Sequence, residues 1–207
     1  MEKKINDFFN GNKPIFIKGV VDGKEMKQYC KSKIDIAFIG RSNVGKSSLI
    51  NCITNSSIAK TSKTAGRTRE INLFSLGEKA ILVDMPGYGY ATADDVKKYD
   101  WRKMIYDYLT CGCKISRLFI LIDSRRGIKE IDFDFLNMLE QEKNINIQGQ
   151  IVLTKIDCLK LTEQKQIQEL TEQQIKIFRK ILPTVLAVSS TKKYGIIEIK
   201  KEIFELI

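Results

Sequence analysis

Apolar residues along the chain gather in short runs that alternate with longer, mixed stretches. The short runs are rich in Val, Ile, Leu and Phe and are bounded by turn-forming residues, a pattern typical of buried strands. Together they predict six strands, at residues 34–40, 71–76, 80–84, 118–123, 147–153 and 183–188.

The longer stretches carry apolar residues three and four positions apart, which is the spacing of a helix that packs one face on a core. They predict helices after residue 48 and at about 94–109, 130–141, 162–180 and 195–207. Strands alternating with helices indicate an α/β fold with a mostly parallel six-stranded sheet. We expect helices on both faces of that sheet.

Residues 1–33 are polar and rich in lysine, apart from one apolar patch at residues 14–21. We interpret this patch as an arm or strand packed on the core. The rest of the chain, residues 34–207, contains neither an internal repeat nor a linker and reads as one domain. A length of 207 residues is sufficient for a substantial core.

Composition places the chain among ordinary soluble proteins, with 43% hydrophobic and 29% charged residues. The first residues lack the apolar centre of a signal peptide, and no stretch is long enough to span a membrane, so we expect a cytoplasmic protein. Five cysteines occur without a C-x-x-C pair and histidine is absent. This argues against zinc and disulfides, and excludes mechanisms that use a Ser-His or Cys-His pair.

The formal net charge of +10 has two interpretations. It favours a polyanionic partner such as nucleic acid, but it also fits a generally basic, lysine-rich proteome. Charge alone leaves the two equally supported.

The first predicted strand breaks into the pattern G-x-x-x-x-G-K-S between Gly40 and Ser47. A strand, this loop and then a helix form the context of a phosphate-binding P-loop, in which backbone N–H groups converge on a polyphosphate. Lys46 would contact the outer phosphates, and the Ser47 hydroxyl would bind Mg2+. The alternative is a plain turn between strand and helix. The loop's other expected ligand-contacting residues are Arg41, Ser42, Asn43, Val44, Gly45 and Ser48.

A second motif, D-x-P-G, ends the strand at residues 80–84 and comprises Asp84, Met85, Pro86 and Gly87. Asp84 is expected at the carboxyl edge of the sheet, where doubly wound folds bind ligands. There it can hold Mg2+ through water, opposite Ser47. The Gly87 N–H can reach a terminal phosphate, which makes the turn sensitive to its presence. The alternative is a strand that simply ends in a Pro-Gly turn.

The third motif, Thr154-Lys155-Ile156-Asp157, follows the fifth predicted strand. The Asp157 carboxylate matches the N1–H and N2–H2 donors of guanine, whereas adenine offers it no donor, so the pocket favours guanine. The Lys155 stem can lie along one face of the base. Residues after the sixth strand complete the expected pocket, with the Ser190 N–H donating to guanine O6; these are Val188, Ser189 and Ser190.

The strings G-R-S-N-V-G-K-S-S-L-I-N, K-T-S-K-T-A-G-R-T, L-V-D-M-P-G-Y-G-Y-A, T-K-I-D and V-S-S together resemble the EngB family of GTP-binding proteins. The resemblance implies a Ras-like P-loop GTPase whose G domain is residues 34–207. It further implies assistance in assembly of the large ribosomal subunit, with a link to normal cell division and septation. Thr68, after Gly66 and Arg67, is implied as the switch threonine that joins Mg2+ and the γ-phosphate.

Catalysis of phosphoryl transfer is expected to rest on positioning and charge neutralisation by Lys46, Asn43, Thr68 and Gly87. Tyr88 stands where Ras has a water-positioning glutamine, so we expect slow intrinsic hydrolysis that a partner accelerates. Asn43 occupies a position at which related GTPases hold K+, and we hypothesise that K+ accelerates hydrolysis here. The alternative is that Asn43 only stabilises the loop.

Expected ligands and partners are GTP or GDP with Mg2+, and the large ribosomal subunit or its precursor, through rRNA and ribosomal proteins. We expect a monomer without membrane association. A basic set could contact rRNA phosphates or form a solvated surface: Lys60, Lys63, Arg67, Arg69, Arg125 and Arg126. Competing hypotheses are a nucleotide-gated RNA- or protein-binding module with incidental hydrolysis, a GTPase of tRNA modification or membrane transport, and, with least support, an ATPase.

Overall fold

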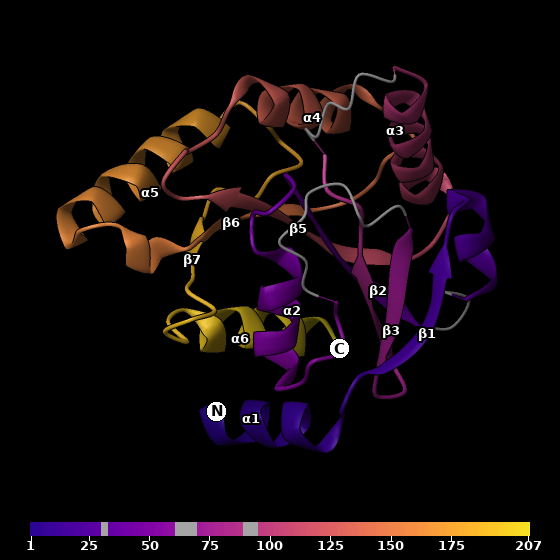
Figure 1. Cartoon of the computed structure of the whole chain (residues 1–207), viewed down its shortest axis with the longest axis horizontal. Helices are drawn as coiled ribbons and strands as arrows, with labels where there is room; N and C mark the ends of the chain where they lie inside the picture. The colour runs from indigo at the N-terminus through magenta and orange to yellow at the C-terminus, as the bar shows by residue number, and fades with distance from the viewer. Residues whose placement is uncertain (30–32, 61–69, 89–94) are drawn as a thin grey trace.

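A computed structural model describes residues 1–29, 33–60, 70–88 and 95–207, with the backbone alone described for 95–101. Across these ranges the strands form one seven-stranded sheet in the order β1-β3-β4-β2-β5-β6-β7 (Figure 1). Their bounds are β1 Ile15–Val20, β2 Ile34–Gly40, β3 Ile71–Leu76, β4 Ala80–Asp84, β5 Ile115–Asp123, β6 Gly149–Thr154 and β7 Leu186–Ala187.

All six predicted strands are present. The apolar patch at residues 14–21, interpreted as an arm or strand, contains a seventh, β1, which pairs antiparallel with β3 at the edge of the sheet. β3 and β4 form the predicted antiparallel hairpin. From β4 through β2, β5 and β6 to β7 every pairing is parallel. The α/β fold class predicted from the sequence is confirmed, with one more strand than expected.

The last strand is shorter than predicted, since β7 covers two residues instead of 183–188. Pro183 has no N–H to donate to a ladder. The neighbouring Thr184 carbonyl accepts instead from the Gln150 side-chain amide, at 2.7 Å. Part of the predicted strand is therefore a connection, in which a backbone carbonyl accepts from a side chain instead of from a neighbouring strand.

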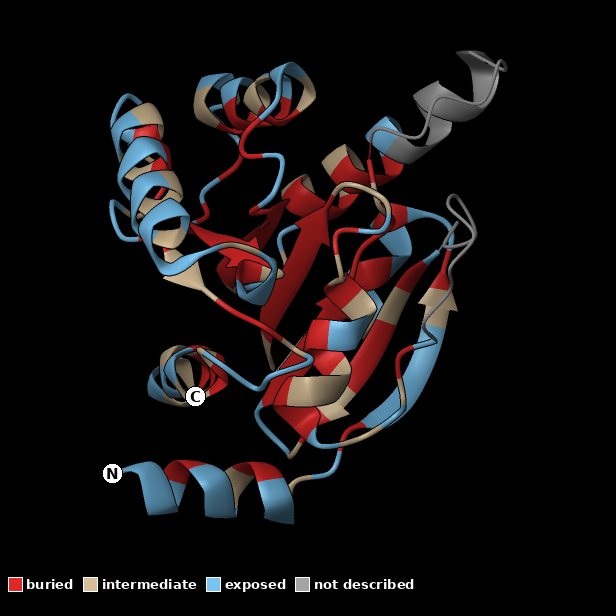
Figure 2. Ribbon diagram, turned by 60° about the vertical axis from the view of Figure 1, so that its left-hand side comes forward, coloured by how far each residue is buried: buried red, intermediate tan, exposed pale blue. Residues whose placement is uncertain are grey.

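Helices cover both faces of the sheet (Figures 1 and 2). Buried residues of α1, α2 and α6 share one core cluster, and those of α3, α4 and α5 share the other. The bounds are α1 Glu2–Gly11, α2 Lys46–Thr54, α3 Asp95–Thr110, α4 Glu130–Gln141, α5 Leu161–Ile175 and α6 Ile196–Leu206, with short 3-10 helices η1 at Gly23–Gln28 and η2 at Ile156–Cys158.

The central strand β2 shows why this layering is stable. Ile36 and Phe38 point to the cluster beneath α1, α2 and α6, whereas Ala37 and Ile39 point to the opposite cluster. All four are fully buried. Alternate side chains of a strand face opposite sides, so a continuous apolar run requires cover on both.

The N-terminal helix α1 was not predicted, because only a few apolar residues stand among its polar ones. Ile5 and Phe9 lie one helical turn apart and are buried against the cluster of α2 and α6. Phe8 meets Phe204 of α6 edge to face, with ring centroids 5.5 Å apart. Residues 1–20 thus contribute both a helix on one face and an edge strand.

Candidate functional site

The loop after β2 depends on glycine at both ends. A Cβ on Gly40 would lie 2.6 Å from the backbone carbonyl oxygen of Leu121, so a side chain there would push β2 away from β5. Gly45 adopts φ 105° at the N-cap of α2, a conformation that strongly favours glycine. Sequence and structure therefore agree on a compact loop that leads directly into α2.

α2 begins at Lys46, and no side chain of the described residues caps its N-terminus. The first-turn N–H groups of a helix have no intrahelical partners and carry the positive end of the helix dipole. This terminus, at the carboxyl edge of the parallel strands, has the chemistry of an anion site.

Three predicted residues meet beside this terminus. The Lys46 ammonium forms a buried ion pair with the Asp84 carboxylate, at the end of β4. The Ser47 hydroxyl lies 3.4 Å from the other oxygen of Asp84. Hydroxyl and carboxylate oxygens are the ligands Mg2+ prefers, and their closeness fits a magnesium ion bound with water molecules.

The D-x-P-G turn is packed directly against the P-loop. The Met85 N–H donates to the Phe38 carbonyl at 3.0 Å, which continues the pairing of β4 with β2. Gly87 follows, and a Cβ there would lie 3.0 Å from both the backbone nitrogen and the hydroxyl of Ser42. Met85 and Pro86 are buried, and Gly87 lies against Ser42 of the P-loop.

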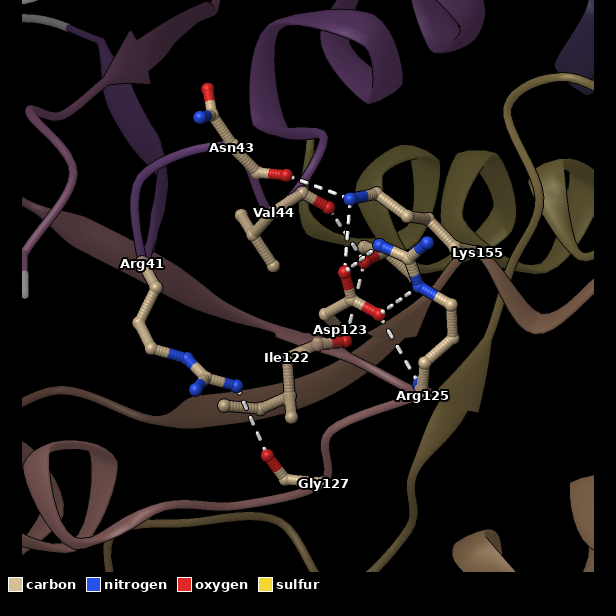
Figure 3. Close-up of polar contacts among 9 residues, drawn as sticks. Arg41, Asn43, Val44, Ile122, Asp123, Arg125, Gly127 and Lys155 are labelled. Atoms are coloured by element: carbon tan, nitrogen blue, oxygen red, sulfur yellow. Dashed lines mark hydrogen bonds and ion pairs between the residues drawn. The ribbon is translucent and has the colours of Figure 1, made fainter. Parts of the chain in front are cut away.

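The third motif also touches the P-loop (Figure 3). The Thr154 hydroxyl donates to the Val44 carbonyl at 2.7 Å, and the Lys155 ammonium donates to the Asn43 carbonyl at 2.7 Å. Both side chains reach across from the end of β6. Asp157 follows in η2 and is exposed, so its carboxylate is open to a ligand from solvent.

The V-S-S segment lies next to this motif. The Ile156 N–H donates to the Val188 carbonyl at 3.1 Å. Ser189 is fully buried, and its hydroxyl accepts from the Lys192 N–H at 2.9 Å, which shapes the loop. Ser190 follows, and its carbonyl accepts a long contact from the Cys52 thiol at 3.6 Å.

Backbone conformation marks the same loops. Among the described non-glycine residues, positive φ occurs at Asn43, Lys155 and Lys193, and at Asn55, where α2 ends. Asn43 lies in the P-loop and Lys155 in the T-K-I-D motif, and Lys193 lies three residues after Ser190 of the V-S-S segment. Left-handed backbone at such residues costs about 1 kcal/mol or more and tends to gather at functional sites.

Asp123, at the end of β5, belongs to this cluster although the sequence motifs do not include it. Its carboxylate accepts from the Lys155 ammonium at 2.9 Å and from two nitrogens of the Arg125 guanidinium at 2.9 and 2.7 Å (Figure 3). Burial alone would raise the pKa of Asp123, but these charged donors outweigh it and hold the pKa well below its ordinary value.

One sequence signal could have identified Asp123, because it is an acidic residue at the carboxyl end of a buried parallel strand, as Asp84 is. The contact also bears on Arg125, which was grouped with the candidate rRNA-binding residues. Its guanidinium forms an ion pair with Asp123, although Arg125 is exposed, as Lys60 and Arg126 are. Other predicted residues lie outside the described ones: Lys63, Gly66, Arg67, Thr68 and Arg69.

Comparisons with known proteins identify relatives of this chain. The family described as "50S ribosome-binding GTPase" matches residues 35–155. A protein named "Probable GTP-binding protein EngB" from Mesorhizobium japonicum is 44% identical, over 91% of this chain and 92% of its own length. One of the same name from Nitrobacter winogradskyi is 41% identical, over 85% and 81%.

Among solved structures, the crystal structure of a probable GTP-binding protein engB matches with a TM-score of 0.65 and 24% identity. The match covers 83% of this chain and 97% of that one, and it supports the fold. Within the described part of the chain, no helix is both long enough and apolar enough to cross a membrane.

Proposed function

From the premise that this chain belongs to the EngB family of GTP-binding proteins, we propose that it is a GTP-hydrolysing switch in assembly of the large ribosomal subunit. The observation that carries the proposal is the convergence of three motif loops on one edge of the sheet. The T-K-I-D motif contacts Val44 and Asn43 of the P-loop, and the D-x-P-G motif contacts it through the ion pair of Asp84 with Lys46. We also propose a link to normal cell division, which the family resemblance implies.

Guanine would be selected by the third motif. Asp157 is exposed at the end of a well-packed segment, so its two carboxylate oxygens can accept from N1–H and N2–H2 of the base. Lys155 is held by Asn43 and Asp123, which fixes its stem beside the expected base position. The Ser190 N–H would donate to guanine O6.

Magnesium would be held by Ser47, by Asp84 through water, and by Thr68 in the GTP state. When bound, the ion neutralises charge on the β- and γ-phosphates. Lys46 forms an ion pair with Asp84 beside the N-terminus of α2, and its ammonium would contact the outer phosphates. The P-loop amides, Lys46 and the Gly87 N–H would then orient the terminal phosphate.

We propose that intrinsic hydrolysis is slow and that a ribosomal partner accelerates it. Tyr88 is fully buried, so the residue in the place of the Ras glutamine is directed away from an attacking water. For Asn43, the backbone carbonyl is engaged by Lys155, whereas its side-chain amide points away from that contact (Figure 3). The side chain is thus available for K+, which we propose as an accelerating ion.

The cation proposal is tested by comparing single-turnover hydrolysis in K+ and Na+, for the unmodified protein and for Asn43→Ala. We expect faster hydrolysis in K+ and loss of the difference in Asn43→Ala. Equal rates in both cations for the unmodified protein would end the K+ role and leave Asn43 as a loop stabiliser.

The switch proposal is tested by sedimentation of a cell lysate with GDP or a non-hydrolysable GTP analogue. We expect co-sedimentation with a large-subunit particle in the GTP-analogue state, weakening steeply with salt. Equal association in both states would refute the switch. Association that depends on GTP, but with hydrolysis that ribosomal subunits do not stimulate, would indicate a nucleotide-gated binding module instead.

A further inference from the structure

Tyr88, directly after the D-x-P-G turn, is packed into the core instead of facing the phosphate site. Its side chain is fully buried, and its ring stacks on Phe135 of α4 with the centroids 5.3 Å apart. The phenol hydroxyl donates a hydrogen bond of 2.8 Å to the Asp132 carboxylate. Tyr88, which stands in the place of the Ras glutamine, is therefore bound to α4 through its side chain.

Asp132, the third residue of α4, is itself completely buried. One carboxylate oxygen accepts from the Lys129 N–H at 2.8 Å, and the other meets both the Tyr88 hydroxyl and the Arg41 guanidinium, at 3.4 Å from Nε. Burial raises the pKa of Asp132, and these donors oppose the rise only in part. A carboxylate this deeply buried is costly to maintain unless donors converge on it, as they do here.

The buried cluster of Tyr88 and Asp132 also contacts the P-loop, through the side chain of Arg41 and through the backbone of Tyr88. Arg41, the second residue of the loop, also donates to the Gly127 carbonyl at 3.1 Å. The backbone of Tyr88 donates to the Gly40 carbonyl at 3.2 Å and accepts from the Ser42 N–H at 3.1 Å. Tyr88 is thus held to the P-loop by its backbone and to the start of α4 by its side chain.

We propose that Asp132, acting through Tyr88, is a positioning residue for the Gly87 amide. This role rests on the proposed function, in which that amide contacts the terminal phosphate of GTP. Gly87 lies between the P-loop contact at Ser42 and the anchored Tyr88, so the anchor fixes how far the amide stands from the phosphate site. The hydrogen bond between Tyr88 and Asp132 thereby favours binding of GTP over binding of GDP.

The test uses Tyr88→Phe, which keeps the ring and its stacking but removes the hydroxyl. Dissociation constants are measured with fluorescent GDP and with a fluorescent non-hydrolysable GTP analogue in Mg2+. Loss of a hydrogen bond to a charged group should weaken binding of the GTP analogue about tenfold, with GDP binding changed by less than about twofold. Tyr106→Phe is the matched control, because its hydroxyl makes a remote contact of 3.4 Å to Glu142.

Asp132→Asn replaces the charged acceptor of the Tyr88 hydroxyl by a neutral one and should shift binding in the same direction. Because the Tyr88–Asp132 bond is shared by both substitutions, the Tyr88→Phe/Asp132→Asn double variant should lose less than the sum of the two single variants. Thermal melting checks that each variant is folded, and if Asp132→Asn is not, Tyr88→Phe alone decides. Equal weakening for both nucleotides, or no change for either, overturns the positioning role. Failure of the unmodified protein to bind guanine nucleotides refutes the proposed function itself.

Discussion

The Lys155 ammonium lies 2.7 Å from the Asn43 carbonyl oxygen, and this contact joins residues 112 positions apart. Both residues have left-handed backbone. Their hydrogen bond ties the loop expected to hold phosphate to the loop expected to hold the base, so ordering one loop orders the other. Asp123 completes the arrangement, because its carboxylate binds the same ammonium at 2.9 Å.

Asp123→Asn should destabilise the protein by about 2 kcal/mol at pH 7, because a buried carboxylate with charged donors is lost. The native pKa of Asp123 lies below its ordinary value of 3.8, so its contribution is complete above that value. It declines as the pH falls below 3.8 toward the native pKa. The difference from the unmodified protein should therefore shrink on acidification.

Urea denaturation at pH 7, 5, 4 and 3 measures this difference. Asp134→Asn is the control, since Asp134 is an exposed residue of α4 and its loss should matter little at any of these pH values. A stability difference that grows as the pH falls would contradict the role assigned to Asp123.

Asp157→Asn should abolish the preference for guanine. The substitution replaces one acceptor by a donor that faces the N1–H and N2–H2 groups, and an unpaired donor in such a site costs binding on the order of 100-fold or more. Competition of GDP and ADP against fluorescent GDP measures the change. Cys158→Ser, at the neighbouring exposed position, should leave both affinities unaltered. Unchanged GDP affinity in Asp157→Asn would place the base elsewhere.

Gly40→Ala should destabilise the fold by about 3 kcal/mol. The new Cβ would lie 2.6 Å from the Leu121 carbonyl oxygen and 3.0 Å from a methyl of Val44, so two parallel strands or the P-loop must shift. Chemical denaturation measures the loss. Gly11→Ala is the matched control, because nothing lies within 4 Å of its added Cβ. Equal stability of the two variants would show that β2 and β5 lie farther apart.

Phe9→Ala should cost about 3 to 4 kcal/mol of unfolding free energy. Phe9 is fully buried between α1 and the rest of its cluster, with the Lys200 ammonium 5.3 Å from the ring centroid. Asp7→Ala, on the exposed side of the same helix, should change stability by less than about 0.5 kcal/mol. If both variants were equally stable in denaturant, α1 would contribute nothing to the core.

The sequence by itself determined the local features. The pattern of apolar residues predicted β2, β3 and β4 with the bounds that the structure has. β2 and β4 are almost continuously apolar because they are buried on both faces, and β3 alternates. Motif chemistry predicted that Lys46, Asp84 and Thr154 lie at one edge of the sheet, since parallel strands direct their carboxyl ends together. These conclusions need only neighbouring residues and the rule for parallel sheets.

Only the tertiary structure decided which side chains meet across that edge. The commitment of Asp123 to Lys155, the burial of Tyr88 against Asp132 and the docking of α1 through Phe9 each join distant parts of the chain. No local period or turn signal encodes such contacts. They depend on strand order and on which helix covers which face, and a buried charge or hydroxyl takes the partner that this packing brings within reach.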